Sequence, residues 1–373
     1  MRGSLKIGRI AKVPVSLHWS LVAIALFLAW DLATVILPDP HPGHSSSLYW
    51  GHGMVAAVLF FGAVLAHELG HALVARRYDI KVEGIELWAL GGLARLGREP
   101  QTPGAEFSIA VAGPLVSLGA AGVFFGVEYV LRSFTALPVI ESTFAWLSGV
   151  NVFLAIFNLL PGAPLDGGRI LRSTVWKITG DRWRAMRASA KAGQALGYGL
   201  IAVGLWWLMS GNGPIMIPVV GWVLLNSARM EEMGARTEAA LVGKQVRDAT
   251  WFGVARATDA TDVATMLWQS GRMGPPKLVA VERFDGSLAG LVSEDQLYRV
   301  PESDRSIVRL AQLVIPMDEL AKASPDDSLM DAARRMNPRA PVLTVWDQGR
   351  LVGIVTAEQF RRLIDRNAGA PTR

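Results

Sequence analysis

Two histidines and a glutamate carry the clearest chemical pattern in this sequence. His67, Glu68 and His71 form a His-Glu-x-x-His motif inside an apolar run from Gly53 to Ala75. On a helix the two histidines lie one turn apart on the same face, where they can hold one zinc ion. Glu68 can then take a proton from a metal-bound water. The run is long enough to cross a bilayer, where ionisable side chains are costly unless they have partners.

A third protein ligand is expected, because a catalytic zinc site has three ligands and one open position for water. The chain has no cysteine, so disulfides and thiolate ligands are excluded and the third ligand must be His, Asp or Glu. Asp166 follows a later apolar stretch and is the candidate, although a turn aspartate that caps a helix is the alternative. Asn158 could hydrogen-bond an oxyanion or the substrate backbone, or instead a neighbouring helix.

The elements that must position these residues are membrane spans. Long apolar runs alternate with basic loops up to about Ala228, and the later part of the 373-residue chain reads as a soluble sequence. Six spans are expected, at about residues 15–37, 53–75, 105–131, 143–160, 192–209 and 213–228.

The distribution of Lys and Arg predicts the orientation of these spans. Basic residues gather before the first span and after the second and fourth, which predicts cytosolic termini. The basic loops between the spans therefore account for the net charge of +5. Nucleic acid is not an expected partner. In this topology, the two histidines and Asp166 lie at the same depth near the cytosolic face.

The segment from Ile85 to Leu96 alternates imperfectly between apolar and polar residues. It predicts a small hairpin that turns at Gly91-Gly92 and dips into the membrane edge, with an ordinary loop as the alternative. Irregular backbone is tolerated at membrane depth only where protein covers it or water reaches it.

The motifs together resemble a known family. His67-Glu68-x-x-His71 in one span, with Asn158-x-x-Pro161-x-x-Pro164-Leu165-Asp166-Gly167 ending a later one, is similar to the site-2 protease family of intramembrane zinc proteases. The six-span subgroup that includes the sporulation protease of bacilli is the most similar part of that family.

The resemblance implies a fold and a set of roles. The fold would be a polytopic α-helical membrane protein that binds one Zn²⁺ per chain. By resemblance, His67, His71 and Asp166 are the zinc ligands, Glu68 is the catalytic base, and Asn158 contacts the substrate or the oxyanion. Gly91 and Gly92 lie in a segment similar to the family's membrane-re-entrant hairpin, which is thought to receive the substrate as an added strand.

One position departs from the family pattern. The family often has Asn a few residues after the Ala-Gly-Pro of the third span, whereas Val116-Ser117 follow Leu115 here. No role of that Asn is transferred to this chain.

The activity implied by the resemblance is hydrolysis of a peptide bond in a substrate's transmembrane segment, near the cytosolic face of the plasma membrane. The substrate would be a membrane protein such as an anti-sigma factor or a signal-peptide remnant. Residues 1–228 would form this protease domain, and a polar linker, 229–244, would follow.

The remainder of the chain contains an internal repeat. The stretch that begins at Ala289 recurs 63 residues later at Val352. Both copies resemble cystathionine-β-synthase (CBS) domains, assigned to residues 245–304 and 305–366 with a tail at 367–373. Such pairs often bind adenine nucleotides, which here would involve Ser293 and Thr356. The Asp expected three residues later is replaced by Gln296 and Gln359, which argues against nucleotide binding and leaves homodimerisation or substrate docking open.

Two other classes of membrane protein share features with parts of the sequence. Aspartyl intramembrane proteases need two motifs in spans, but Tyr78-Asp79 and Gly180-Asp181 lie in basic loops. CBS modules also regulate channels and transporters, so the alternative function is a metal-ion carrier or channel without hydrolytic activity. A carrier has no need for Glu68 beside a metal ligand, and carriers often show two related membrane halves, which the spans here lack.

Overall fold

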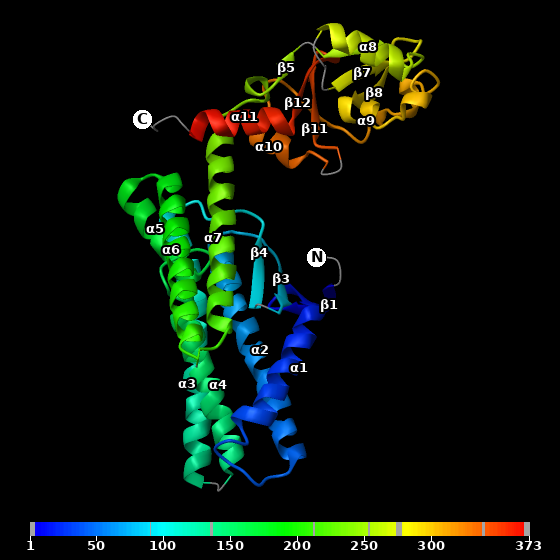
Figure 1. Ribbon diagram of the computed structural model, residues 1–373. Helices are drawn as coiled ribbons and strands as arrows, with labels where there is room; N and C mark the ends of the chain where they lie inside the picture. Colours follow the sequence, from blue (N-terminus) through cyan, green and yellow to red (C-terminus); the bar gives the residue numbers. More distant parts are fainter. Residues whose placement is uncertain are drawn as a thin grey trace. The chain divides into compact units, whose positions relative to one another are not determined.

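The computed structural model describes residues 4–89, 91–134, 137–211, 213–252, 254–273, 278–337 and 340–368. Most of the predicted tail, 367–373, lies outside them. The chain divides into two compact units, Met1–Ala235 and Arg236–Arg373 (Figure 1). Each unit is described separately below.

The first unit is mostly helical. Its helices are α1 (Trp19–Asp31), a π-helical continuation (Leu32–Ile36), α2 (Ser46–Arg77), α3 (Pro103–Phe134), α4 (Pro138–Asn158), α5 (Asp166–Thr179), α6 (Arg182–Met209) and α7 (Met216–Leu241), whose last residues belong to the second unit. In Figure 1, α2 runs beside α1, and it also packs against α3 and α4. This central position lets residues on α2 contact several other elements.

Five helical segments in the described part of the chain are long and apolar enough to cross a membrane. They are Trp19–Ile36, Ser46–Arg77, Pro103–Ser133, Pro138–Asn158 and Arg182–Met209. The expected sixth span, residues 213–228, falls largely in α7, which is not among them. The count of six spans therefore remains a prediction.

A four-stranded sheet lies against these helices. Its strands are β1 (Ser4–Ile10), β2 (Val13–His18), β3 (Val82–Trp88) and β4 (Gly91–Leu96), in the spatial order β1-β2-β3-β4. Its inner face carries Val13, Ile85 and Leu87, which pack against Val64 and Ala72 of α2. The alternation of apolar residues along β2 and β3 thus attaches the sheet to the helix that carries the histidines.

Some predicted boundaries are wrong. Residues 15–18, which we assigned to the first span, belong to β2, and α1 begins at Trp19 because His18 caps it by accepting a hydrogen bond from the Ser20 amide. The hairpin does not turn at Gly91-Gly92. Trp88 pairs with Gly91, so that both glycines belong to β4.

Two later helices also extend beyond the predicted limits. α6 begins at Arg182 rather than at 192, where the side chain of Asp181 caps it by accepting hydrogen bonds from the amides of Trp183 and Arg184. α7 continues to Leu241 through most of the segment that we expected to be a linker.

The second unit contains two four-stranded sheets, with orders β6-β7-β8-β9 and β10-β11-β12-β5. The strands are β5 (Trp251–Phe252), β6 (Ala255–Thr258), β7 (Leu278–Glu282), β8 (Leu288–Ser293), β9 (Ile315–Pro316), β10 (Ala321–Ala323), β11 (Val342–Asp347) and β12 (Arg350–Thr356). The α-helices are α8 (Val263–Met273), α9 (Glu294–Tyr298), α10 (Leu329–Arg334) and α11 (Ala357–Ala368), and the 3₁₀ turns are Val246–Asp248, Glu302–Asp304 and Leu310–Gln312.

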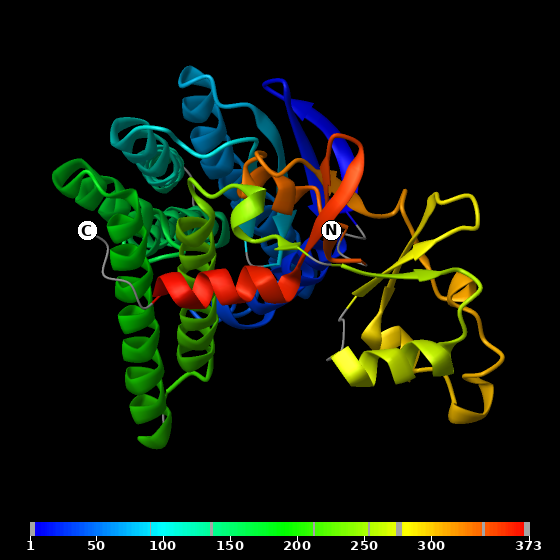
Figure 2. The same ribbon diagram turned by 90° about the horizontal axis from the view of Figure 1, so that it is seen from above.

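The two copies of the sequence repeat adopt the same local structure. β8 leads into α9 in the first copy, and β12 leads into α11 in the second. Helix α8 lies beside the strands of the first sheet (Figure 2). Its Val263 and Met266 pack against Val279 and Val281 of β7. The short strand β5, from the start of the unit, pairs with β12 and so completes the sheet of the second copy.

Candidate metal centre

Three buried side chains converge at the junction of α2 and α5. His67 and His71 lie on one face of α2, and Asp166 is the first residue of α5. Asp166 Oδ2 lies 3.2 Å from His67 Nε2 and 3.2 Å from His71 Nε2. The two Nε2 atoms are 3.1 Å apart. Among the described residues, these three form a group whose ligand atoms all lie within 4.8 Å of one another.

This triangle of atoms has the dimensions of one face of a tetrahedral zinc site. Bonds of about 2.0–2.1 Å to His nitrogen and carboxylate oxygen place tetrahedral ligand atoms roughly 3.3–3.4 Å apart. The observed separations of 3.1–3.2 Å are close to this value. Two imidazoles and one carboxylate are also a donor set that zinc accepts, with one position left for water or substrate. The residues present therefore fit a catalytic zinc ion.

The surroundings of Asp166 favour its ionised form. Burial raises the pKa of the Asp166 carboxyl, but the hydrogen bonds and charges of His67 and His71 outweigh burial, and the net pKa lies below that of an ordinary aspartate. An ionised carboxylate is the form that coordinates metal ions.

Helix α3 fixes the orientation of both imidazole rings. His67 Nδ1 lies 2.9 Å from the hydroxyl of Ser117, and His71 Nδ1 donates to the carbonyl oxygen of Ile109 at 2.7 Å. Partners of this kind on the far nitrogen leave Nε2 free to bind metal. Our sequence analysis missed both residues, because neither a single serine nor a backbone carbonyl has a recognisable spacing.

Gly113 is the point at which α3 covers the two rings. A Cβ at position 113 would lie 2.3 Å from His71 Nε2 and 2.5 Å from His67 Nε2. The glycine is thus needed for the close approach of α3, and any side chain there would enter the metal position. In the sequence, Ala112-Gly113-Pro114 served only to locate the position at which the family often has Asn.

Glu68 points toward the sheet instead of joining the three ligands. The backbone amide of Ala94 in β4 donates a hydrogen bond to Glu68 Oε2 at 3.2 Å. Gly92, also in β4, lies against the same side chain, and a Cβ at position 92 would be 2.3 Å from Glu68 Cγ. The predicted hairpin therefore contacts the predicted base directly.

The remaining predicted site residues lie in other surroundings. Asn158 donates its amide to the carbonyl oxygen of Leu154 on its own helix, at 3.0 Å. In the second unit, the Ser293 hydroxyl caps α9 by accepting a hydrogen bond from the Gln296 amide, and the Thr356 hydroxyl is hydrogen-bonded to the side chain of Gln359. Both hydroxyls are thus engaged by the glutamines that replace the expected aspartates.

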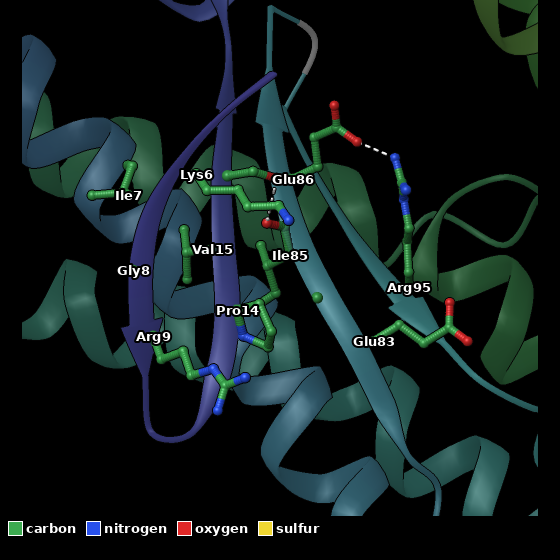
Figure 3. A pocket seen from close by; sticks show the side chains of 12 residues that line it. Lys6, Ile7, Gly8, Arg9, Pro14, Val15, Glu83, Ile85, Glu86 and Arg95 are labelled. Carbon is green, nitrogen blue, oxygen red and sulfur yellow. Dashed lines mark hydrogen bonds and ion pairs between the residues drawn. The ribbon is translucent and has the colours of Figure 1, made fainter. Parts of the chain in front are cut away.

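A hollow of about 630 Å³ lies on the sheet and does not include the metal cluster (Figure 3). Charged side chains line it, and Arg95 donates a hydrogen bond to Glu86 across it. Its remaining lining comes from β1, β2 and β3, with Lys6 and Arg9 as further cations and Glu83 as a further anion.

Known proteins match both parts of the chain. The model of peptidase family M50 matches residues 55–137 and 132–201, and the CBS-domain model matches residues 312–366. The chain is 37% identical over 369 residues to Rip3 of Mycobacterium tuberculosis, which is classed by name with zinc metalloproteases. That alignment covers 98% of this chain and 94% of Rip3. The chain belongs to peptidase family M50, the site-2 protease family.

A second relative and one solved structure are also similar to the chain. The chain is 29% identical over 379 residues to sll0528 of Synechocystis, also classed by name with zinc metalloproteases, and the alignment covers 99% of this chain and 97% of sll0528. Among solved structures, the site-2 protease of Methanocaldococcus jannaschii is 30% identical, with a TM-score of 0.44, and covers 61% of this chain and 95% of that one.

As a member of the site-2 protease family, the protein is a membrane zinc metalloendopeptidase with a C-terminal CBS region. The predicted fold class, a polytopic helical membrane protein followed by an α/β CBS region, is confirmed, apart from the number of spans. The alternative of a metal-ion carrier without hydrolytic activity does not agree with family membership.

Proposed function

We propose that this site-2 protease hydrolyses a peptide bond within a substrate's transmembrane segment, near the cytosolic face. The observation that carries the proposal is the buried triangle of His67, His71 and Asp166, with Glu68 beside it on α2. α2 is long and apolar enough to cross a membrane, so the site lies on a membrane helix. The distribution of basic residues supports placing its His-bearing end, which is followed by Arg76 and Arg77, on the cytosolic side.

The proposed roles follow from what each side chain can reach. His67, His71 and Asp166 would hold zinc, which as a Lewis acid supplies a water of lowered pKa and a polarised carbonyl. Glu68 would take the proton of the attacking water and deliver it to the leaving amine. Asn158, in the last turn of α4, is the proposed contact for the substrate backbone or the oxyanion.

The hairpin is the proposed substrate-binding element. Gly91 and Gly92 begin β4, which is an edge strand of the sheet. A substrate segment unwound into a strand could pair with that edge, since an exposed strand edge offers unpaired backbone groups. The contact of β4 with Glu68 supports this role, because a strand bound there would lie next to the proposed base.

The proposed setting is the plasma membrane, with both termini in the cytosol and a transmembrane protein such as an anti-sigma factor or a signal-peptide remnant as substrate. Residues 245–366 would regulate the protease, dock substrates or form a homodimer. The engagement of Ser293 and Thr356 in contacts with glutamines supports docking or dimerisation over nucleotide binding.

Replacing Glu68 with Gln tests the proposed chemistry. Glu68→Gln removes the base while keeping the shape of the side chain, so we expect one zinc per chain to remain and cleavage to fall by at least about 10³-fold, within the range of general acid–base contributions. Membrane-protein fragments that accumulate in cells with the wild-type enzyme, but not with Glu68→Gln, identify substrates for assay with purified protein. Glu83→Gln, which changes an exposed carboxylate on β3, is the matched control.

Each outcome of this experiment decides the proposal. Loss of cleavage with retained zinc supports it, and normal cleavage by Glu68→Gln would refute the assigned role. Loss of zinc from Glu68→Gln, but not from Asp166→Asn, would contradict the proposed ligand set.

A further inference from the structure

Strand β4, which contacts Glu68, has one free edge, and its pairing with β3 shows which backbone groups point toward that edge. Among the described strands, β4 pairs with β3 only, and it is the last strand of the sheet. The register joins Trp88 to Gly91, Leu87 to Gly92, Glu86 to Leu93 and Ile85 to Ala94. Trp88 and Gly91 therefore close a hairpin with a two-residue connection.

The alternation of antiparallel pairing then assigns each backbone group of β4. The residues that close a two-residue hairpin exchange hydrogen bonds, and bonded and non-bonded pairs alternate along the ladder. Gly92 and Ala94 consequently fall in non-bonded pairs. Their N–H and C=O groups point away from β3, toward the free edge.

Glu68 occupies this free edge. Its Oε2 accepts the hydrogen bond of the Ala94 amide at 3.2 Å, which agrees with the direction assigned from the register. At Gly92, an added Cβ would lie 2.3 Å from Cγ, 2.8 Å from Cδ and 2.9 Å from Oε1 of Glu68. The carboxylate is thus held by one backbone donor and confined by the backbone of a glycine.

We propose that Gly92 and the Ala94 amide are positioning residues for Glu68, so that β4 sets the place from which the base acts. This rests on the proposed role of Glu68. It also assigns Gly92 a role different from that of a turn residue: position 92 must lack a side chain because the base lies there. A substrate strand paired with the groups of this edge that Glu68 leaves unbonded would be in fixed register with the base.

Two variants separate this positioning from general effects on folding. Gly92→Ala adds a methyl group where the Glu68 side chain lies, and Gly62→Ala is its matched control, because a Cβ at position 62 of α2 meets nothing within 4 Å. Incorporation of lactic acid in place of Ala94 converts that amide into an ester and removes the N–H without adding bulk. The same ester at Leu93, whose amide falls in a bonded pair, is the control for loss of a ladder hydrogen bond.

The assay uses the full-length protein in detergent or liposomes with a membrane substrate that the wild type cleaves. Zinc content and thermal unfolding are measured for every variant. We expect Gly92→Ala and the Ala94 ester to lower kcat by roughly 10- to 100-fold, the effect of a small misplacement of a catalytic group, with KM within about twofold of the wild type. Zinc content should stay at one per chain, and the Leu93 ester should lower stability but not kcat of the folded protein.

Two results would overturn the inference. One is an Ala94 ester with the kcat of the wild type, which would show that the amide does not hold the base. The other is a loss confined to KM in both variants, which would mean that β4 aligns the substrate without positioning Glu68. Either result would leave the proposed function standing if Glu68→Gln is inactive, whereas an active Glu68→Gln would overturn the proposed function itself.

Discussion

At the scale of single residues, the site divides into groups that a sequence can reveal and groups that it cannot. The spacing of His67 and His71 and the position of Asp166 indicated the same three side chains that the structure brings together. Ser117 and the Ile109 carbonyl were not found, because their role depends on how α3 is rotated against α2. That rotation is set by non-local packing, which no single stretch of sequence encodes.

Ser117 provides a test of how the imidazoles are held. Ser117→Ala removes the partner of His67 Nδ1, and loss of such a partner typically lowers metal affinity by about 10- to 100-fold. We expect this reduction in a competition titration of purified protein with a zinc chelator, with the fold preserved. Ser148→Ala is the matched control, since Ser148 donates instead to the Ala121 carbonyl of α3. Equal zinc affinities for the two variants would rule out the role of Ser117.

At the scale of elements, α5 carries Asp166 and is fixed by a buried group of charges. Arg172 of α5 donates to Glu106 near the start of α3, and it also lies 3.5 Å from Glu231 of α7. Glu106 is 1% exposed and Arg172 is 8% exposed, so both charges are largely removed from bulk water. These ion pairs connect three helices and hold α5 in the place from which Asp166 meets α2.

Replacing Glu106 and replacing Glu231, the two partners of Arg172, should affect stability differently. Glu106→Gln leaves a buried guanidinium without its close partner, and breaking a buried pair costs about 3–5 kcal/mol. We expect a loss near the lower end of this range in unfolding measurements at neutral pH, because Glu231 remains close to Arg172. A change below about 1 kcal/mol in Glu106→Gln would contradict the importance of this pair.

Glu231 should instead give a pH-dependent effect. Burial raises the pKa of Glu231, although the charges of Arg172 and Arg169 oppose the rise. The folded protein therefore binds the Glu231 proton more tightly than the unfolded chain does. This proton binding stabilises the fold at low pH, and the stabilisation is lost as the pH rises through the raised pKa. Relative to wild type, the free energy of unfolding of Glu231→Gln should increase as the pH rises from the usual pKa of a glutamate to the raised pKa of Glu231. Denaturant unfolding at a series of pH values measures this difference.

Element boundaries show why local patterns predicted less than the motifs did. Val13, Val15 and Leu17 alternate as a strand does, but the apolar run that follows led us to extend the first span backwards. Gly91 and Gly92 suggested a turn, whereas Gly92 is required by the close approach of Glu68. In both places a contact with a distant segment decides the structure: β2 pairs with β3, and β4 lies on α2.

At the scale of the whole molecule, the sequence repeat predicted the second unit but not the exchange of strands within it. The matching stretches that begin at Ala289 and Val352 form equivalent strand–helix pairs. The pairing of β5 with β12 joins the start of the unit to its end, and such pairing has no local signal.

The number of spans decides on which side of the membrane the second unit lies, and it can be tested with cysteines because the natural chain has none. If α7 crosses, six spans place the second unit in the cytosol with the N-terminus. If only the five clearly apolar segments cross, the second unit lies outside. The predicted topology requires the first arrangement, since the positive-inside rule places the basic loops after α2 and α4 in the cytosol.

Four single-cysteine variants at exposed positions distinguish these arrangements. Ser46→Cys and Ser210→Cys lie in the expected outer connections, Lys177→Cys lies in the expected inner loop, and Ser303→Cys reports on the second unit. A membrane-impermeant maleimide applied to intact cells or spheroplasts should label the first two. It should label Lys177→Cys and Ser303→Cys only after the membrane is opened. Labelling of Ser303→Cys in intact cells, with Lys177→Cys still protected, would contradict the six-span arrangement, because it would place the second unit outside the cell while the loop after α4 lies in the cytosol. The second unit could then not act on substrates from the cytosolic side, where the proposed cleavage occurs.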